Sequence, residues 1–205
     1  MLKISLTNFL TFNSKISMSA KRKHVADFKS SEYFPGMDYW KDLRSGIKQV
    51  ALGKIKPTDL VALSEGMPDY KSKRKNYLHN ANNFIRFVKD KNIKYFSVGS
   101  ATWTLDDKVS INASPEFGME IDGIKYCVKT YLKVPKSDTK VNLRNTAATL
   151  TLMEAAPKDF DDTDCKYAVL NLQNGKLLTS VPNSADDIVD LELEAENYLN
   201  IWNHI

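Results

Sequence analysis

The spacing of apolar residues changes character near residue 93 and divides the chain into two regions. Before this point, apolar side chains recur at three- and four-residue steps, which is the period of an amphipathic helix. The clearest run begins at Asp38, a residue type suited to N-capping, and contains Trp40, Leu43, Ile47 and Val50. The first region therefore predicts helices over about 38–52, 57–66 and 72–90, with a short element near 6–12 and a basic connector at 21–24.

Beyond residue 93 the pattern alternates, as in half-buried strands. Segments 94–105, 108–113 and 167–172 predict strands, and helices are predicted over 145–157 and 184–202. Asp122-Gly123 and Asn174-Gly175 each lie between two strand-like runs and indicate two-residue hairpin loops. We therefore expect an α+β fold, with a basic helical region at 1–92 and a mostly antiparallel sheet with flanking helices at 93–205, together forming one compact unit.

The Asp122-Gly123 loop predicts a register for its two strands. Facing residues have numbers that sum to 245, so Glu120 faces Lys125 and Glu116 faces Lys129. Because side chains alternate along a strand, these charged residues and Cys127 share one face. Apolar residues such as Tyr126 and Val128 lie on the other face. The hairpin is therefore predicted to have one charged face and one apolar face.

Composition is that of an ordinary globular protein. The chain has 205 residues, of which 42% are hydrophobic and 26% are charged. No apolar run approaches the length of a membrane span, and polar residues interrupt the N-terminal stretch too often for a signal peptide. Cys127 and Cys165 have no spacing typical of a zinc site. We expect a cytoplasmic protein that does not contact membranes.

Charge is distributed unevenly between the two halves. Residues 1–100 carry 19 Lys and Arg against 8 Asp and Glu, whereas residues 101–205 carry 10 against 17. A net charge of +11 beside −7 favours binding of the first half to a polyanion or to an acidic surface, although Lys-rich helix surfaces are common. Cations at the start of the helix over 72–90 oppose its dipole, which a phosphate backbone would offset and a solvated, salt-screened surface would tolerate. The candidate nucleic-acid contacts are Lys41, Arg44, Lys73, Arg74, Lys75, Lys125 and Lys133.

Pro115-Glu116 on one strand and Cys127-Val128-Lys129 on the next resemble the motif of the PD-(D/E)XK, or restriction-endonuclease-like, superfamily. The order of helix, three strands, helix and strand over residues 72–180 also resembles that core. The resemblance implies that Glu116 binds Mg²⁺, that Lys129 orients water or stabilises charge, and that DNA or RNA is cleaved. Cys127 departs from the motif because a carboxylate is expected there. Another carboxylate would have to complete the site, with Asp38, Glu120 and Glu154 as candidates.

Other interpretations of these residues remain open. Glu opposite Lys on adjacent strands is a common cross-strand ion pair, and two such pairs predict a solvent-facing ladder with no chemistry. A lysine-rich binding face without metal is a further alternative. Tyr33, Phe34, Tyr39 and Trp40 lie among cations, a mixture suited either to stacking on single-stranded nucleic acid or to core packing.

The leading functional hypothesis is a nucleic-acid-binding protein with a nuclease-like core whose cleavage activity the sequence leaves open. The alternative is a noncatalytic interaction module or assembly scaffold, which pairs its basic face with an acidic protein or with the acidic C-terminal helix of another copy. The sequence contains no P-loop, dinucleotide-binding glycine motif, serine hydrolase elbow or His-Glu-x-x-His motif, so those enzyme classes lose support.

Overall fold

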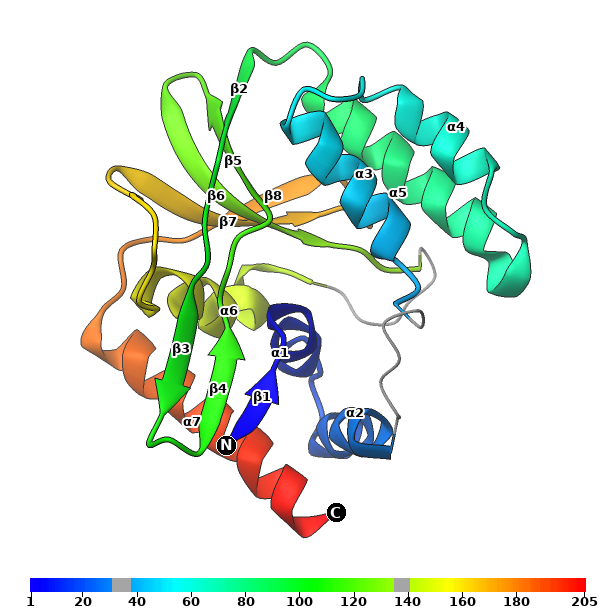
Figure 1. Ribbon diagram of the computed structural model, residues 1–205. Helices are drawn as coiled ribbons and strands as arrows, with labels where there is room; N and C mark the ends of the chain where they lie inside the picture. Colours follow the sequence, from blue (N-terminus) through cyan, green and yellow to red (C-terminus); the bar gives the residue numbers. More distant parts are fainter. Residues whose placement is uncertain (31–37, 135–140) are drawn as a thin grey trace.

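Two mixed β-sheets organise the fold in the computed structural model, which describes residues 1–30, 38–134 and 141–205 (Figure 1). The larger sheet has five strands in the order β2 (Ile93–Phe96), β5 (Phe117–Ile121), β6 (Ile124–Tyr131), β7 (Cys165–Asn171) and β8 (Lys176–Thr179). Neighbouring strands are antiparallel except β6 and β7, which are parallel. The crossover between that parallel pair contains α6 (Leu143–Ala155).

The smaller sheet has the order β1 (Leu2–Ile4), β4 (Val109–Asn112) and β3 (Thr102–Leu105). The numbers of paired residues sum to 214 both between β2 and β5 and between β3 and β4. These four strands are therefore one long hairpin that bends between the two sheets, as Figure 1 shows. Glu116 lies at this bend, one residue before β5 begins.

Helices cover both faces of the five-stranded sheet. One face packs against α3 (Lys41–Ala51), α4 (Asp59–Glu65) and α5 (Lys73–Val88), which is preceded by a short 3₁₀ turn, η2 (Tyr70–Ser72). The other face packs against α1 (Leu6–Asn13), α6 and α7 (Ala185–His204). Helix α2 (Met18–Ser30) lies beside α7. None of the helices in the described residues is long and apolar enough to cross a lipid bilayer.

The α+β fold class is confirmed, as is the register of the first hairpin. Ile121 pairs with Ile124, and Glu120 pairs with Lys125. Asp122 and Gly123 both have positive φ, as the two-residue loop requires. Among the described strands, four pairings are antiparallel and two are parallel.

Two expectations about local structure are corrected. The basic connector at 21–24 is part of α2, which Lys21 and Val25 anchor through buried side chains. The loop at Asn174-Gly175 has four residues rather than two, because Asn171 pairs with Lys176. The strand segments predicted within 94–105 are β2 and β3, and β1 of the first region pairs with β4.

The predicted charged face of the hairpin is also corrected, because both faces of the sheet are buried from Cys127 onward and only the loop end, with Lys125, is exposed. Cys127 and Tyr131 belong to the core under α1, α6 and α7, whereas Met119 and Val128 belong to the core under α3 and α5. Periodicity within the hairpin could not reveal this, because the covering helices come from distant parts of the chain.

Candidate functional site

Glu116 and Lys129 are brought together at the bend of the long hairpin. The Glu116 N–H donates a hydrogen bond of 2.8 Å to the carbonyl of Val128, the residue that pairs with Phe117, so the ladder departs from the predicted register by one residue just before β5 begins. The Glu116 carboxylate accepts from Lys129 Nζ with one oxygen. Its other oxygen accepts from the Thr130 N–H, at 3.0 Å, and from the Thr130 hydroxyl. Both oxygens of this carboxylate are therefore engaged.

Lys129 is a buried cation. Lys129 is 3% exposed, and its Nζ also donates a hydrogen bond to the Thr130 carbonyl at 2.9 Å. Burial lowers the pKa of the Lys129 ammonium, and Glu116 opposes this shift by favouring the charged form. The expectation of a solvent-facing ladder is wrong for this pair, because the sheet is covered here. At the other pair, Glu120 makes its ion pair with exposed Lys94, at 3.5 Å.

Helix α3 completes this group of charges. Arg44 Nε lies 3.4 Å from Glu116 Oε1, and its Nη1 lies 2.7 Å from Asp38 Oδ2. Strand β2 ends opposite Gly118, so β2 does not cover the sheet edge beside Glu116, and α3 packs there instead. We call Asp38, Arg44, Glu116, Lys129 and Thr130 the Glu116 cluster. Its two carboxylates and two cations balance, and the Arg44 guanidinium faces carboxylates rather than a free surface.

A cavity of about 240 Å³ opens beside the Glu116 cluster. It lies between the end of α3 and the end of β2, and exposed Lys48 lies at its edge. Its lining residues are Lys48, Ala51, Leu52, Tyr95, Phe96, Ser97, Val98, Glu116 and Phe117. The cavity walls are partly polar and partly apolar, and the Glu116 carboxylate at one side is already paired.

The residues at the motif positions do not fit a magnesium ion in this arrangement. Magnesium prefers oxygen ligands in octahedral geometry, but Cys127 is fully buried and burial raises the pKa of its thiol. A Cβ at neighbouring Gly118 would lie 2.1 Å from the Phe96 ring, so this ring covers the sheet between Glu116 and Cys127. An apolar ring and a neutral thiol therefore stand where the resemblance requires ligands.

The three carboxylates considered as replacements have other partners. Asp38 pairs with Arg44, Glu120 pairs with Lys94, and Glu154 accepts from the Asn183 N–H at 3.2 Å. Within the described residues, no group of three or more His, Cys, Asp or Glu side chains is arranged to hold a metal ion. Magnesium binding stays a prediction without a described ligand set.

The predicted nucleic-acid contacts do not form one surface. Lys125 and Lys133 lie near opposite ends of β6, roughly 25 Å apart along the strand. Lys133 is half-buried, and both burial and the nearby charge of Lys15 lower its pKa. Arg44 belongs to the Glu116 cluster. The remaining four, Lys41, Lys73, Arg74 and Lys75, lie at the N-terminal ends of α3 and α5.

Side-chain contacts join these two helix ends. Lys73 Nζ lies 3.1 Å from Asp42 Oδ2, the Tyr39 hydroxyl donates to the Lys71 carbonyl at 3.2 Å, and Asn76 Nδ2 donates to the Tyr39 hydroxyl at 2.8 Å. We call this region the basic helix end and define it by its cations, Lys41, Lys71, Lys73, Arg74 and Lys75. Lys41 and Lys75 are exposed there.

The start of α5 lacks the usual devices that satisfy a helix N-terminus. Its N-cap, Ser72, has φ of +57° and makes no side-chain capping hydrogen bond, and the first turn has no acidic residue. Among the nearby aromatic residues, Trp40 stacks on Tyr77 with ring centroids 5.3 Å apart, which favours core packing over base stacking. Tyr33 and Phe34 lie outside the described residues.

Sequence reasoning missed the roles of Arg44 and Thr130 in the Glu116 cluster. Arg44 and Asp38 are six residues apart, and neither shows a local pattern that points to a strand more than 70 residues away. No model of a known protein family matches the chain, and no curated protein sequence is significantly similar to it.

Proposed function

We propose that the protein binds nucleic acid at the basic helix end and that its nuclease-like strand pair does not cleave. The observation that carries the proposal is the start of α5, where cations gather around first-turn N–H groups that no side chain caps. Cations near a helix N-terminus and uncapped N–H groups both destabilise the helix end on their own. Both become favourable when a phosphate lies beside them. Helix α3 adds Lys41 to the same surface.

The geometry of the Glu116 cluster supports a structural role. Both oxygens of Glu116 are occupied by donors from Lys129 and Thr130, so neither is free to activate water. The neighbouring thiol of Cys127 is buried and neutral. What the cluster does is tie α3 to the bend of the long hairpin, and α3 in turn presents part of the basic helix end.

The binding test uses short labelled DNA and RNA, single- and double-stranded, in fluorescence anisotropy at low salt. The double variant Lys41→Ala/Lys75→Ala should lose affinity on the order of tenfold to a hundredfold, because it removes two phosphate contacts. Lys166→Ala is the matched control, since Lys166 is an exposed lysine on β7, away from both helices. If the unaltered protein binds none of these oligonucleotides, the proposal fails and the interaction-module alternative gains.

The cleavage test uses supercoiled DNA with Mg²⁺. The unaltered protein should leave the DNA intact, so metal-dependent nicking by it would contradict a noncleaving core. Cys127→Asp restores a carboxylate at the motif position, and metal-dependent nicking by this variant would support the resemblance to the nuclease superfamily. A folded Cys127→Asp variant that binds no metal would remove that support. Cys165→Asp, on the neighbouring strand, is the control for an added carboxylate.

The location that fits this proposal is the cytoplasm. Cys127 and Cys165 are both free thiols, and they lie on the same face of adjacent strands β6 and β7. Free cysteines held this close together are typical of a reducing compartment.

A further inference from the structure

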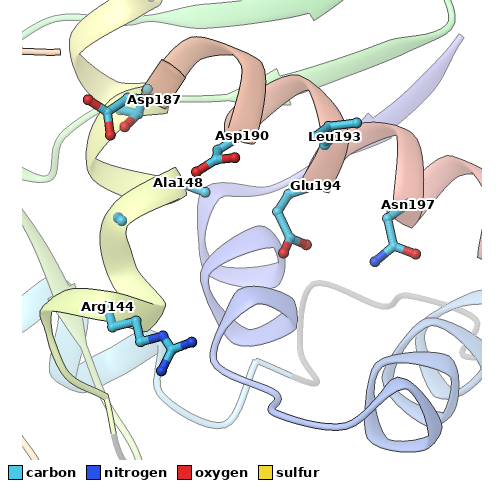
Figure 2. Close-up of a pocket in the computed structure, with 9 residues that line it drawn as sticks. Arg144, Ala148, Asp187, Asp190, Leu193, Glu194 and Asn197 are labelled. Atoms are coloured by element: carbon cyan, nitrogen blue, oxygen red, sulfur yellow. The ribbon is translucent and has the colours of Figure 1, made fainter. Parts of the chain in front are cut away.

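A groove lies between α6 and α7 (Figure 2), and these two helices are on the side of the sheet away from α3 and α5 (Figure 1). Its volume is about 390 Å³. Small side chains of Ala147, Ala148 and Thr151 come from α6, as does the cation Arg144, and the acids Asp187, Asp190 and Glu194 come from α7. An adjoining cavity of about 180 Å³ shares Ala147, Thr151 and Asp187 with it, so the two form one continuous depression.

Exposed apolar residues surround this depression. Leu143 is 56% exposed, Val181 is 75% exposed and Leu193 is 56% exposed, and each lines one of the two cavities. Val189, on the same helix as Leu193, is 52% exposed. Single exposed apolar residues are common, but a group of them around a groove is typical of an interaction surface.

The turn between α1 and α2 supplies a complementary projection beside the groove. Ile16 is 94% exposed and Met18 is 53% exposed, and the basic residues Arg22 and Lys23 follow them on the exposed side of α2. Two contacts to α7 hold this turn in place. Lys21 pairs with Glu194 at 2.6 Å, and Asn197 Nδ2 lies 3.9 Å from Met18 Sδ.

We propose that this face binds a second copy of the chain about a two-fold axis. In a two-fold symmetric interface, the same surface of each copy takes part. That surface must therefore contain both of the parts that fit each other. The α1–α2 turn presents apolar side chains beside cations, and the groove presents apolar side chains beside three acids and one cation, Arg144. Glu194 and Asn197, which line the groove, hold the turn directly, so both parts lie on one face of each copy.

The charges favour a second copy over an acidic occupant. Helix α7 carries six acidic residues and no Lys or Arg, so its exposed side repels an acidic protein and attracts the basic turn. The apolar residues of both parts are then buried together, and the basic helix end stays free because it lies on the opposite face of the sheet.

The test is the oligomeric state of the full chain, measured by sedimentation equilibrium over a range of concentrations. The unaltered protein should be a dimer, whereas Ile16→Lys and Leu193→Lys should each shift it to the monomer. Leu52→Lys is the matched control, because Leu52 is also an exposed leucine, at 51%, but lies at the end of α3. That variant should remain a dimer.

Two results would overturn the dimer. One is a monomeric protein at every concentration, including one whose groove takes up a basic peptide instead. The other is a dimer that persists in both the Ile16→Lys and Leu193→Lys variants, since the copies would then meet elsewhere. Circular dichroism checks that each variant is folded, and nucleic-acid binding is measured separately, so failure of this interface and failure of the proposed function are distinguishable.

Discussion

Individual buried charges set the character of the Glu116 cluster. Lys129 is surrounded by protein and receives compensation from the Glu116 carboxylate and the Thr130 carbonyl. Removing one member of a buried ion pair leaves the other without compensation, which costs far more than losing a pair at the surface. The cluster is therefore expected to affect folding more strongly than it affects binding.

Lys129→Met should lower the free energy of unfolding by about 3 to 5 kcal/mol, because Glu116 loses its closest cation. Glu116→Gln should have an effect of similar size, and the double variant should lose less than the two combined, with a coupling above about 1 kcal/mol. Urea denaturation measures all three. Lys94→Met, at an exposed ion pair, is the control and should change stability by less than about 0.5 kcal/mol. A loss below about 1 kcal/mol in Lys129→Met would show that the pair is not buried in solution.

His24 makes stability depend on pH because it is buried in its neutral form, unlike the paired charges of the Glu116 cluster. Its Nε2 lies 3.2 Å from Asn8 Oδ1 and 3.3 Å from the Asn8 carbonyl, an arrangement in which Nε2–H is the donor. Burial, helped by the charges of Lys15 and Lys133, lowers the pKa of His24 to about 4, although the hydrogen bond to the Asn8 carbonyl and the charge of Asp27 act in the opposite direction. The folded state therefore keeps this imidazole neutral at pH values where the unfolded chain protonates it.

Because the pKa in the fold lies below the ordinary value of 6.5, stability is lost as pH falls from about 6.5 to about 4. Between pH 7 and pH 5 the loss due to His24 should be about 1 to 2 kcal/mol. Comparing the unaltered protein with His24→Gln isolates this contribution from that of the carboxylates. His204→Gln, which removes an exposed histidine at the end of α7, is the control. An equal pH dependence in all three proteins would contradict a neutral buried His24.

Elements were predictable where the deciding interactions are local. The Asp122-Gly123 loop determines the register of its hairpin because turn geometry and strand alternation act within a few residues. The same reasoning placed α3, α5 and α7 through their apolar spacing. It misassigned 21–24, where Lys21 and Val25 are buried in α2 by contacts with elements far along the chain.

The candidate site was predictable in its pairing but not in its surroundings. Glu116 meets Lys129 because the predicted register, confirmed as far as Phe117 and Val128, brings the two residues close together. Whether that pair is exposed depends on α3 and on the helices across the sheet, and no pattern inside the hairpin reports on them. Burial and the Arg44 contact arise from this long-range packing, and the Phe96 ring lies over Gly118 because β2 pairs with β5.

The loop itself offers a test at the scale of one element. Gly123 has φ of +81°, a conformation that costs an alanine about 1 kcal/mol, and no atom within 4 Å would clash with an added Cβ. Gly123→Ala should therefore destabilise the protein through the backbone alone, as measured by thermal unfolding. Gly66, which has ordinary φ of −71° at the end of α4, is the control, and Gly66→Ala should be neutral or slightly stabilising. Equal effects at both positions would contradict the positive φ at Gly123.

Across the whole molecule, the charge difference between the halves is partly neutralised inside the fold. Helix α2 from the basic half lies along acidic α7, where Lys21 pairs with Glu194 and Lys29 donates to the Trp202 carbonyl at 2.7 Å. The +11 of the first half is therefore not all available to a polyanion. The basic helix end keeps Lys41, Lys71, Arg74 and Lys75 exposed, so our proposal expects binding to depend on these local cations rather than on net charge.

The salt dependence of the binding affinity distinguishes binding through local cations from binding through the net charge of the molecule. Each lysine that contacts a phosphate of double-stranded DNA contributes about 0.9 to the slope of log affinity against log salt, so Lys41→Ala/Lys75→Ala should reduce the slope by about 2. Lys108→Glu/Lys166→Glu changes net charge more, from +4 to 0, but its sites lie at the turn between β3 and β4 and on β7. Its slope should stay unchanged, because counterions are released only where lysines meet phosphates. If the second variant flattens the slope more than the first, the overall field of the molecule drives binding and the basic helix end is not the interface.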